Sequence, residues 1–256
     1  MKVIHHRLPE FEQLQILPLA DLHIGDIHAD GKKIQEWITY IGETDNCYTI
    51  FNGDLMNTAT KNSLSFDYSG LTPMNELEQC VKLLTPIRSK CLCITGGNHE
   101  RRISRDTSID TTFLLAEQLG IIDRYAPESA LLFVQFGKQS TFKHSQPMLY
   151  TIYCTHGSGG GRKEGGKINR LVDLANIVDA DCYIHSHTHL PLIAKNAYYR
   201  TNTRHCTVSK VDRLFLNTSS SLEYGGYGEV ASMKPNSLET PLILLNGKKR
   251  EMKAIL

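Results

Sequence analysis

Five short polar clusters, each directly after an apolar run, constrain the fold of this chain more than any other feature. They are Asp21-Leu22-His23, Gly53-Asp54, Gly97-Asn98-His99-Glu100, Thr155-His156-Gly157 and Ser186-His187-Thr188-His189. An apolar run that ends in such a cluster is typical of a strand followed by a loop. Open α/β sheets place ligand sites at the carboxyl ends of their strands, where such loops converge. We therefore expect one sheet edge to bring together residues far apart in the sequence.

Segments of helical periodicity separate these runs and indicate an α/β fold. Strands are expected near residues 14–20, 48–51, 91–95, 150–154 and 182–185. Helices are expected around residues 34–41, 77–84, 113–119 and 168–178, with Asp30 and Thr72 near the first two starts and Gly42 and Gly120 as stops. The alternation favours a parallel sheet, whereas residues 131–154 look like strands without a helix. A second, mixed sheet packed against the first is therefore expected.

The C-terminal third has a different character. Residues 191–235 are polar and rich in Gly and Tyr, and a strand is expected there at 213–216. Residues 241–256 predict a hairpin around Asn246-Gly247, because this dipeptide supplies the positive φ angles of a tight turn. With 256 residues, 41% of them hydrophobic, and no repeat or linker, we predict a single domain over residues 1–256.

Composition limits the class of protein only modestly. The net charge of +1 favours neither nucleic acid nor membrane as a partner of the whole molecule. The N-terminus lacks the apolar core of a signal peptide, and no apolar run approaches the length of a membrane span. Seven cysteines without a Cys-x-x-Cys pair predict buried thiols in a reducing compartment, with a zinc site at Cys91 and Cys93 as the weaker alternative. We therefore expect a cytoplasmic protein.

Taken singly, the clusters are of unequal weight. Asp21 and His23 lie on the same side of an extended segment, but a hydrogen-bonded pair explains them as well as a metal pair does. Asp54 after a glycine fits a capped turn even better. The stretch 185–189 is stronger, because three histidines at alternate positions share one face and rarely serve packing. Together, these oxygen and imidazole ligands are as numerous as two divalent cations require.

The order Asp-x-His, Gly-Asp, Gly-Asn-His-Glu, His and His-x-His resembles that of the calcineurin-like metallophosphoesterases. This family includes the Mre11-type nucleases, and the chain looks closest to compact members carried by phages and prophages. The resemblance covers roughly residues 13–220, and its one departure is Ser186, where the family usually has glycine. It implies a four-layer α-β-β-α sandwich with two mixed β-sheets.

The resemblance also implies how the clusters divide between two metals. The first metal would be held by Asp21, His23, Asp54 and His189. The second metal would be held by Asp54, Asn98, His156 and His187. A hydroxide bridging the metals, about 4 Å apart, would attack phosphorus. His99 would stabilise or protonate the leaving oxygen and is therefore predicted to be catalytic and not a ligand.

Substrate contacts are expected beside these motifs. Arg101 and Arg102 follow the Gly-Asn-His-Glu motif, and Arg162 and Lys163 lie in a glycine-rich loop that precedes a predicted helix. Such residues can hold a phosphate or a nucleic-acid backbone, although a solvated connector explains the loop equally well. Glu100 has either an orienting role or a place on a surface helix. Manganese is the most favoured metal, with iron, nickel or zinc also compatible.

The predicted function is hydrolysis of phosphodiesters, of the nucleotide or nucleic-acid type, by a dinuclear metal centre. A phosphomonoesterase with the same centre is the first alternative, because the loops that select a substrate are not legible in the sequence. A non-catalytic scaffold of the same fold is the second, and its mark would be missing ligands. We expect no membrane association and see no sign of an obligate protein partner.

Overall fold

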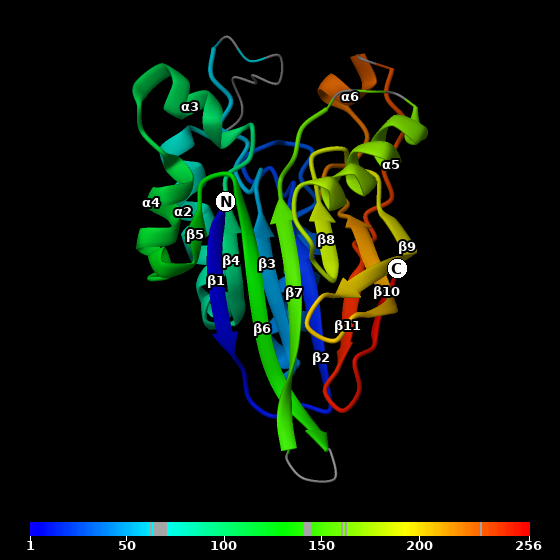
Figure 1. Ribbon diagram of the computed structural model, residues 1–256. Coiled ribbons are helices and arrows are strands. Elements are labelled where there is room, and N and C mark those ends of the chain that lie inside the picture. Colours follow the sequence, from blue (N-terminus) through cyan, green and yellow to red (C-terminus); the bar gives the residue numbers. More distant parts are fainter. Residues whose placement is uncertain (62, 64–70, 141–144, 160, 162, 231) are drawn as a thin grey trace.

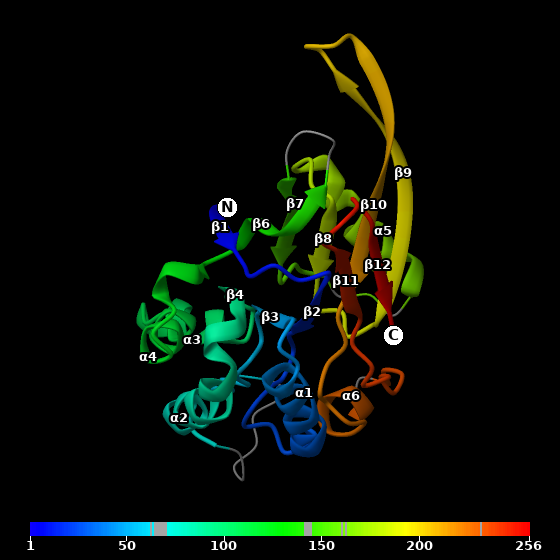
Figure 2. The same ribbon diagram turned by 90° about the horizontal axis from the view of Figure 1, so that it is seen from below.

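Two six-stranded β-sheets face each other and carry helices on their outer surfaces (Figures 1 and 2). The structure is a computed structural model and describes residues 1–61, 63, 71–140, 145–159, 161, 163–230 and 232–256. Helices cover both outer faces, so the order of layers is α-β-β-α. The predicted fold class, a four-layer sandwich with two mixed sheets, is confirmed.

The first sheet contains the early strands of the chain. Its order is β12 (Met252–Ile255), β11 (Leu242–Asn246), β2 (Gln13–Leu19), β3 (Cys47–Asn52), β4 (Cys91–Thr95) and β5 (Tyr125–Ala126). Strands β2 to β5 are mutually parallel, whereas β11 and β12 are antiparallel additions at one edge. The central strands are covered on both faces, which explains why they read as nearly continuous apolar runs.

The second sheet combines parallel and antiparallel neighbours. Its order is β1 (Lys2–Arg7), β6 (Ser129–Ser140), β7 (Ser145–Thr155), β8 (Cys182–His185), β10 (Thr207–Asn217) and β9 (Leu192–Asn202). The strand expected at 213–216 is present as the end of β10, but β9 and the rest of the hairpin of two 11-residue strands were not predicted. Most of this hairpin is exposed, so its sequence lacks the apolar alternation that marks a half-buried strand.

The first two of the six α-helices in the described residues begin where the predicted caps stand. The six are α1 (Gly31–Glu43), α2 (Pro73–Leu84), α3 (Glu100–Thr107), α4 (Thr111–Gln118), α5 (Glu164–Asp173) and α6 (Gly226–Val230). Asp30 and Thr72 accept backbone N–H groups of α1 and α2, as predicted. Gly42 does not stop α1, which continues to Glu43. In the described part of the chain, no helix is long and apolar enough to cross a membrane.

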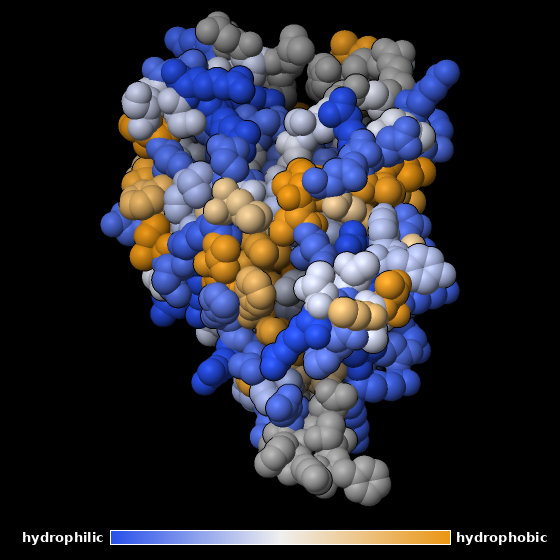
Figure 3. All heavy atoms as spheres, in the orientation of Figure 1, coloured by the Kyte–Doolittle hydropathy of each residue, from blue (hydrophilic) through white to orange (hydrophobic). Residues whose placement is uncertain are grey.

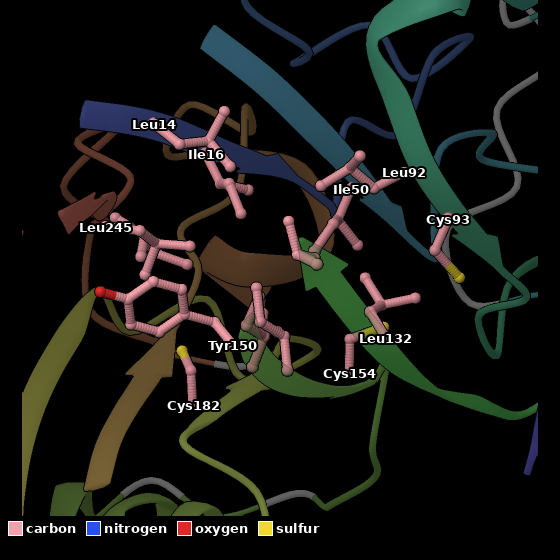
Figure 4. Close-up of a cluster of buried hydrophobic side chains, with 14 of the residues drawn as sticks. Leu14, Ile16, Ile50, Leu92, Cys93, Leu132, Tyr150, Cys154, Cys182 and Leu245 are labelled. Carbon is pink, nitrogen blue, oxygen red and sulfur yellow. The ribbon is translucent and has the colours of Figure 1, made fainter. Parts of the chain in front are cut away.

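The main core lies between the two sheets. Figure 4 shows side chains from both sheets pointing toward one another, among them Leu14, Ile50, Leu132 and Tyr150. The hydroxyl of Tyr150 donates to the carbonyl of Asn246 at 2.7 Å, so its polar atom is satisfied inside an apolar cluster. Two further clusters lie under α1, α2 and α4 on one outer face and under α5 on the other. This packing fixes the shared edge at which the strands end.

The C-terminal hairpin is present, but its turn differs from the prediction. Residues 247–251 connect β11 and β12, so the turn is longer than Asn246-Gly247 alone. Gly247 is not among the glycines with positive φ in the described chain. A Cβ at Gly247 would lie 2.1 Å from the carbonyl oxygen of Phe11, so close approach requires this glycine. The predicted reason, a positive φ angle, was therefore wrong.

Candidate metal centre

The predicted ligands lie together at the carboxyl ends of strands from both sheets. Asp21 follows β2, Asp54 follows β3, His156 follows β7 and His187 follows β8. These ends meet at the upper edge of the molecule in Figure 1. Parallel strands bring their carboxyl ends to one edge, which explains how residues so distant in sequence meet here.

Asp21, His23 and His189 form one group of possible ligand atoms, all within 4.8 Å of one another. The Nε2 atom of His189 lies 3.1 Å from Oδ1 of Asp21 and 3.4 Å from Nε2 of His23. Asp21 is fully buried, and its Oδ2 accepts the backbone N–H of His187 at 3.0 Å. The carboxylate is therefore held in place while Oδ1 faces the histidines.

Asp54, His156 and His187 form a second group within the same limit. Nε2 of His156 lies 3.2 Å from Oδ2 of Asp54 and 3.1 Å from Oδ1 of Asn98. Asp54 also belongs to a third group, with His23 and His99. It is thus the residue common to the two halves of the predicted centre.

The donor set fits a divalent cation. Nδ1 of His156 must donate to the carbonyl of Asn52 at 2.8 Å, so Nε2 of a neutral ring would direct its lone pair at the oxygens of Asp54 and Asn98. Three electron-rich atoms that converge in this way require a proton or a metal ion between them. Hydrogen bonding of Nδ1 to a carbonyl is also how metal-bound histidines are usually oriented.

Without a cation, the charge of Asp54 is balanced by a proton on His156. Burial opposes the charge on His156, but the neighbouring carboxylate of Asp54 outweighs burial and raises the pKa of His156 to about 10. Burial would raise the pKa of Asp54, yet the histidines around it hold that pKa well below its ordinary value. Burial and the positive His156 lower the pKa of His187 to about 4. A dense pair of opposite charges therefore occupies a buried site.

The backbone is left-handed at most of the candidate ligands. Positive φ angles occur at Asp21 (51°), His23 (44°), Asp54 (50°), His187 (65°) and His189 (53°). Each non-glycine residue in this conformation costs about 1–2 kcal/mol. Nine non-glycine residues of the described chain have a positive φ, and five of them are candidate ligands. Strain concentrated in this way is typical of a functional site.

Glu100 supports the loop that carries Asp54. Its Oε2 accepts the backbone N–H groups of Asp54 and Gly97, and its Oε1 accepts that of Met56, all at 3.0 Å. Glu100 is only 3% exposed, so the surface-helix alternative was wrong. Burial, followed by the charge of Asp54, raises the pKa of Glu100 to about 7.

Glu76, on α2, supports the neighbouring loops and escaped sequence analysis. Its Oε2 accepts the backbone N–H of Thr58 at 2.6 Å, and a Cβ added to Gly25 would lie 2.4 Å from its Cγ. Burial raises the pKa of Glu76 to about 7. A signal existed, because Glu76 stands beside Leu77 and four residues before Cys80 on the apolar face of the helix.

His99 lies beside the candidate metal centre, and Arg101 and Arg102 have different partners. Nδ1 of His99 donates to the carbonyl of Asn57 at 2.8 Å, and the guanidinium of Arg102 donates to Nε2 at 2.9 Å. The ring is therefore neutral in this arrangement. Arg101 instead pairs with Glu128. Figure 3 shows hydrophilic side chains gathered at the upper left, over α3, from which both arginines project.

The glycine-rich loop packs tightly against the centre's supporting residues. A Cβ at Gly157 would lie 2.1 Å from Nε2 of His185, whose Nδ1 lies 2.8 Å from Oδ1 of Asn217. Nζ of Lys167 donates to the carbonyl of Thr188 at 2.7 Å. Lys163 is an exposed residue just before α5, and Arg162 lies outside the described residues. The cation of Lys167 thus holds the histidine-bearing loop.

Comparison with known proteins agrees with this geometry. Residues 22–191 match the sequence model of the family described as calcineurin-like phosphoesterase. A search of curated proteins found no match.

Solved structures with a similar arrangement have low sequence identity and low TM-scores. One is a conserved uncharacterized protein from Streptococcus pneumoniae TIGR4, described as a predicted phosphoesterase, with 15% identity over 95% of this chain and 89% of that chain (TM-score 0.38). A metallophosphoesterase from Sphaerobacter thermophilus has 13% identity over 91% and 84% (TM-score 0.42). A double mutant of Vps29 from Entamoeba histolytica has 11% identity over 94% and 98% (TM-score 0.43).

Proposed function

This chain belongs to the calcineurin-like phosphoesterase family, and on that premise we propose that it is a dinuclear metal-dependent phosphodiesterase acting on nucleotides or nucleic acid. Kinship with the Mre11-related and phage-type members is part of the same proposal. The observation that carries it is Asp54, a buried carboxylate within ligand distance of histidines from two separate groups. A carboxylate shared in this way suits a pair of cations better than a single one.

Seven side chains would hold the cations in two sets that share one carboxylate. The first set is Asp21, His23, Asp54 and His189. The second set is Asp54, Asn98, His156 and His187. When bound, two divalent cations neutralise phosphate oxygens and lower the pKa of water, which gives a nucleophile near neutral pH. Manganese is the proposed metal, and iron, nickel and zinc suit the same oxygen and imidazole donors.

His99 and Arg102 would act on the substrate directly. The hydrogen bond from Nδ1 of His99 to Asn57 fixes the ring and leaves Nε2 as the atom that takes or gives a proton. A substrate phosphate would attract the Arg102 guanidinium away from Nε2, which could then carry a proton to the leaving oxygen. Arg101, Arg162 and Lys163 are proposed as outer contacts to a longer substrate.

A panel of chromogenic substrates tests this proposal. Bis-p-nitrophenyl phosphate and p-nitrophenyl phosphate are offered to the metal-stripped protein with Mn²⁺, Fe²⁺, Ni²⁺ or Zn²⁺. We expect faster turnover of the diester, a loss of at least about a thousandfold in Asp54→Asn, and loss of turnover with retained metal in His99→Asn. Asp45→Asn is the matched control, because Asp45 is an exposed loop residue remote from the ligands.

Each alternative corresponds to a distinct outcome of that panel. Preference for the monoester would establish the phosphomonoesterase instead. Absence of turnover with every metal, together with no metal in the purified protein, would establish the scaffold. Full activity in Asp54→Asn would also overturn the proposal, because it would show that the shared carboxylate is not needed.

A further inference from the structure

The β9–β10 hairpin is an arm that extends beyond the body of the protein. Figure 2 shows its far end projecting away from both sheets. The exposed fraction is 80% at Tyr199 and 62% at Val208, values unlike those of a packed strand. The arm is defined as residues 192–217: its base packs in the core through Leu214, Phe215 and Leu216, whereas its outer part presents side chains to the solvent.

The arm differs in charge from the rest of the chain. Residues 192–217 contain five Lys or Arg side chains and one acid, Asp212. Because the whole chain has 28 basic and 27 acidic residues, 23 basic and 26 acidic residues remain outside the arm. Residues 182–211 contain no Asp or Glu at all. A positive arm on a slightly negative body is the pattern expected where an anionic polymer binds.

Only part of this positive charge is neutralised within the protein. Arg200 and Arg213 both pair with Asp179, at 2.8 and 2.7 Å. Arg204 and Lys210 are exposed, and neither forms an ion pair with any described residue. They lie at the outer end of the arm, where a ligand can approach from several sides.

An aromatic ring accompanies the outer charges. Tyr199 and Lys210 are directly opposite each other in the antiparallel register, so their side chains point to the same face of the ribbon. An exposed ring can stack on a base, and an exposed ammonium can contact the adjacent phosphate. Arg200, the next residue, points to the other face, where it meets Asp179. The two faces thus have separate roles.

We propose that the arm binds the phosphate backbone and bases of a nucleic acid whose scissile bond lies at the metal centre. The choice of nucleic acid as the ligand rests on the proposed phosphodiesterase function. The positive charge and the exposure of the arm are observed independently of that function. β9 begins three residues after His189, so the base of the arm adjoins a candidate ligand. An 11-residue strand spans about 35 Å, which is the length of about ten base pairs.

Binding of labelled DNA tests this inference without requiring turnover. Fluorescence anisotropy is measured with a 30-nucleotide single strand and the matching duplex, in EDTA, over a range of salt concentrations. The arm variant carries Arg204→Gln and Lys210→Gln. The control variant removes the same charge at exposed positions of α1 and α2, through Lys32→Gln and Lys82→Gln. Circular dichroism verifies that both variants are folded.

The arm variant should bind duplex more than tenfold more weakly at 0.1 M salt, and its salt slope should shrink by about 1.8. Tyr199→Ser should weaken single-strand binding by about fivefold or more, since stacking is lost. The control variant should bind within twofold of the wild-type protein. Binding by the arm variant equal to that of the control, or no binding by the wild-type protein, would overturn the inference.

A second copy of the chain is the competing occupant, because β9 is an edge strand. Sedimentation velocity at micromolar concentration distinguishes it: a dimer that the arm variant abolishes, with DNA binding unchanged, would assign the arm to self-association and refute our inference. Failure of the phosphoesterase panel would remove the proposed function but leave the EDTA binding result standing. The two proposals therefore fail separately.

Discussion

Replacing Gly97 with alanine tests how closely the candidate centre depends on backbone packing. A Cβ at this position would lie 2.0 Å from Oδ1 and 2.2 Å from the backbone nitrogen of Asp54. Ordinary van der Waals contact begins at 3.4 Å, so either the new Cβ or the Asp54 carboxylate must move by about 1.4 Å. Asp54 is the group shared by the two ligand sets, and a displacement of about 1 Å can lower a rate about a hundredfold.

We expect Gly97→Ala to lose at least about a hundredfold in turnover of bis-p-nitrophenyl phosphate. Overpacking of this kind should also lower the stability of folding by about 2 kcal/mol, or a Tm about 4–8 °C lower. Calorimetric titration with Mn²⁺ should show weaker binding. These three measurements separate damage to the centre from general unfolding.

Gly96→Ala is the matched control because it adds the same methyl group one residue earlier. Its Cβ would lie 3.1 Å from the carbonyl oxygen of Pro127, which requires a shift of only a few tenths of an ångström. The control should keep its rate within threefold of the wild-type protein. If Gly97→Ala is as active as Gly96→Ala, the centre does not depend on this packing and the reasoning is wrong.

Three further perturbations follow from the geometry. The folded protein keeps the proton on Glu76 up to about pH 7, whereas the unfolded chain releases it near 4.5, so stability should fall as pH rises between these values. Urea unfolding in EDTA should show that Glu76→Gln makes this decline smaller by up to about 3 kcal/mol and leaves the part due to Glu100, whose pKa is also about 7. An unchanged decline would contradict the burial argument. Arg102→Gln should lower kcat/KM for the diester by at least about tenfold, while Arg105→Gln, one turn away and exposed, should not; equal effects would show that position beside His99 is irrelevant. Adding Mn²⁺ at a hundred times its Kd should raise Tm by about 5–10 °C for each site that fills, because binding to the folded state contributes about 2.7 kcal/mol per site, and so by about 10–20 °C for the two proposed sites. No shift in calorimetry would argue against a metal centre.

Sequence patterns predicted the central strands and the places where they end. The runs at β4 and β8 were predicted to the residue because they are buried on both faces and therefore apolar except at the last residue of each. Their ends are marked by glycine or a polar ligand, so position along the strand also predicted which side chains would meet. The strand limits and the meeting of these side chains both follow from strand geometry, which the sequence pattern predicts.

Features that depend on tertiary context were not predicted. α3 has no apolar face to mark it, since only Glu100 among its residues is buried. The outer part of the arm lacks a regular apolar pattern because it leaves the body of the protein. The support given by Glu76 depends on a loop about 18 residues away in sequence folding against it. Contacts of that kind leave no periodic trace in the chain.

The left-handed backbone at Asp21 and Asp54 also determines which replacements the fold accepts best. Asparagine tolerates a positive φ and keeps an oxygen for the N–H groups of His187 and His99 that these aspartates accept. Such a replacement would preserve the path of the loops while removing the charge that attracts cations. Within this architecture, an enzyme and an inert look-alike would differ by an oxygen exchanged for a nitrogen. Backbone comparison alone therefore cannot tell the two apart.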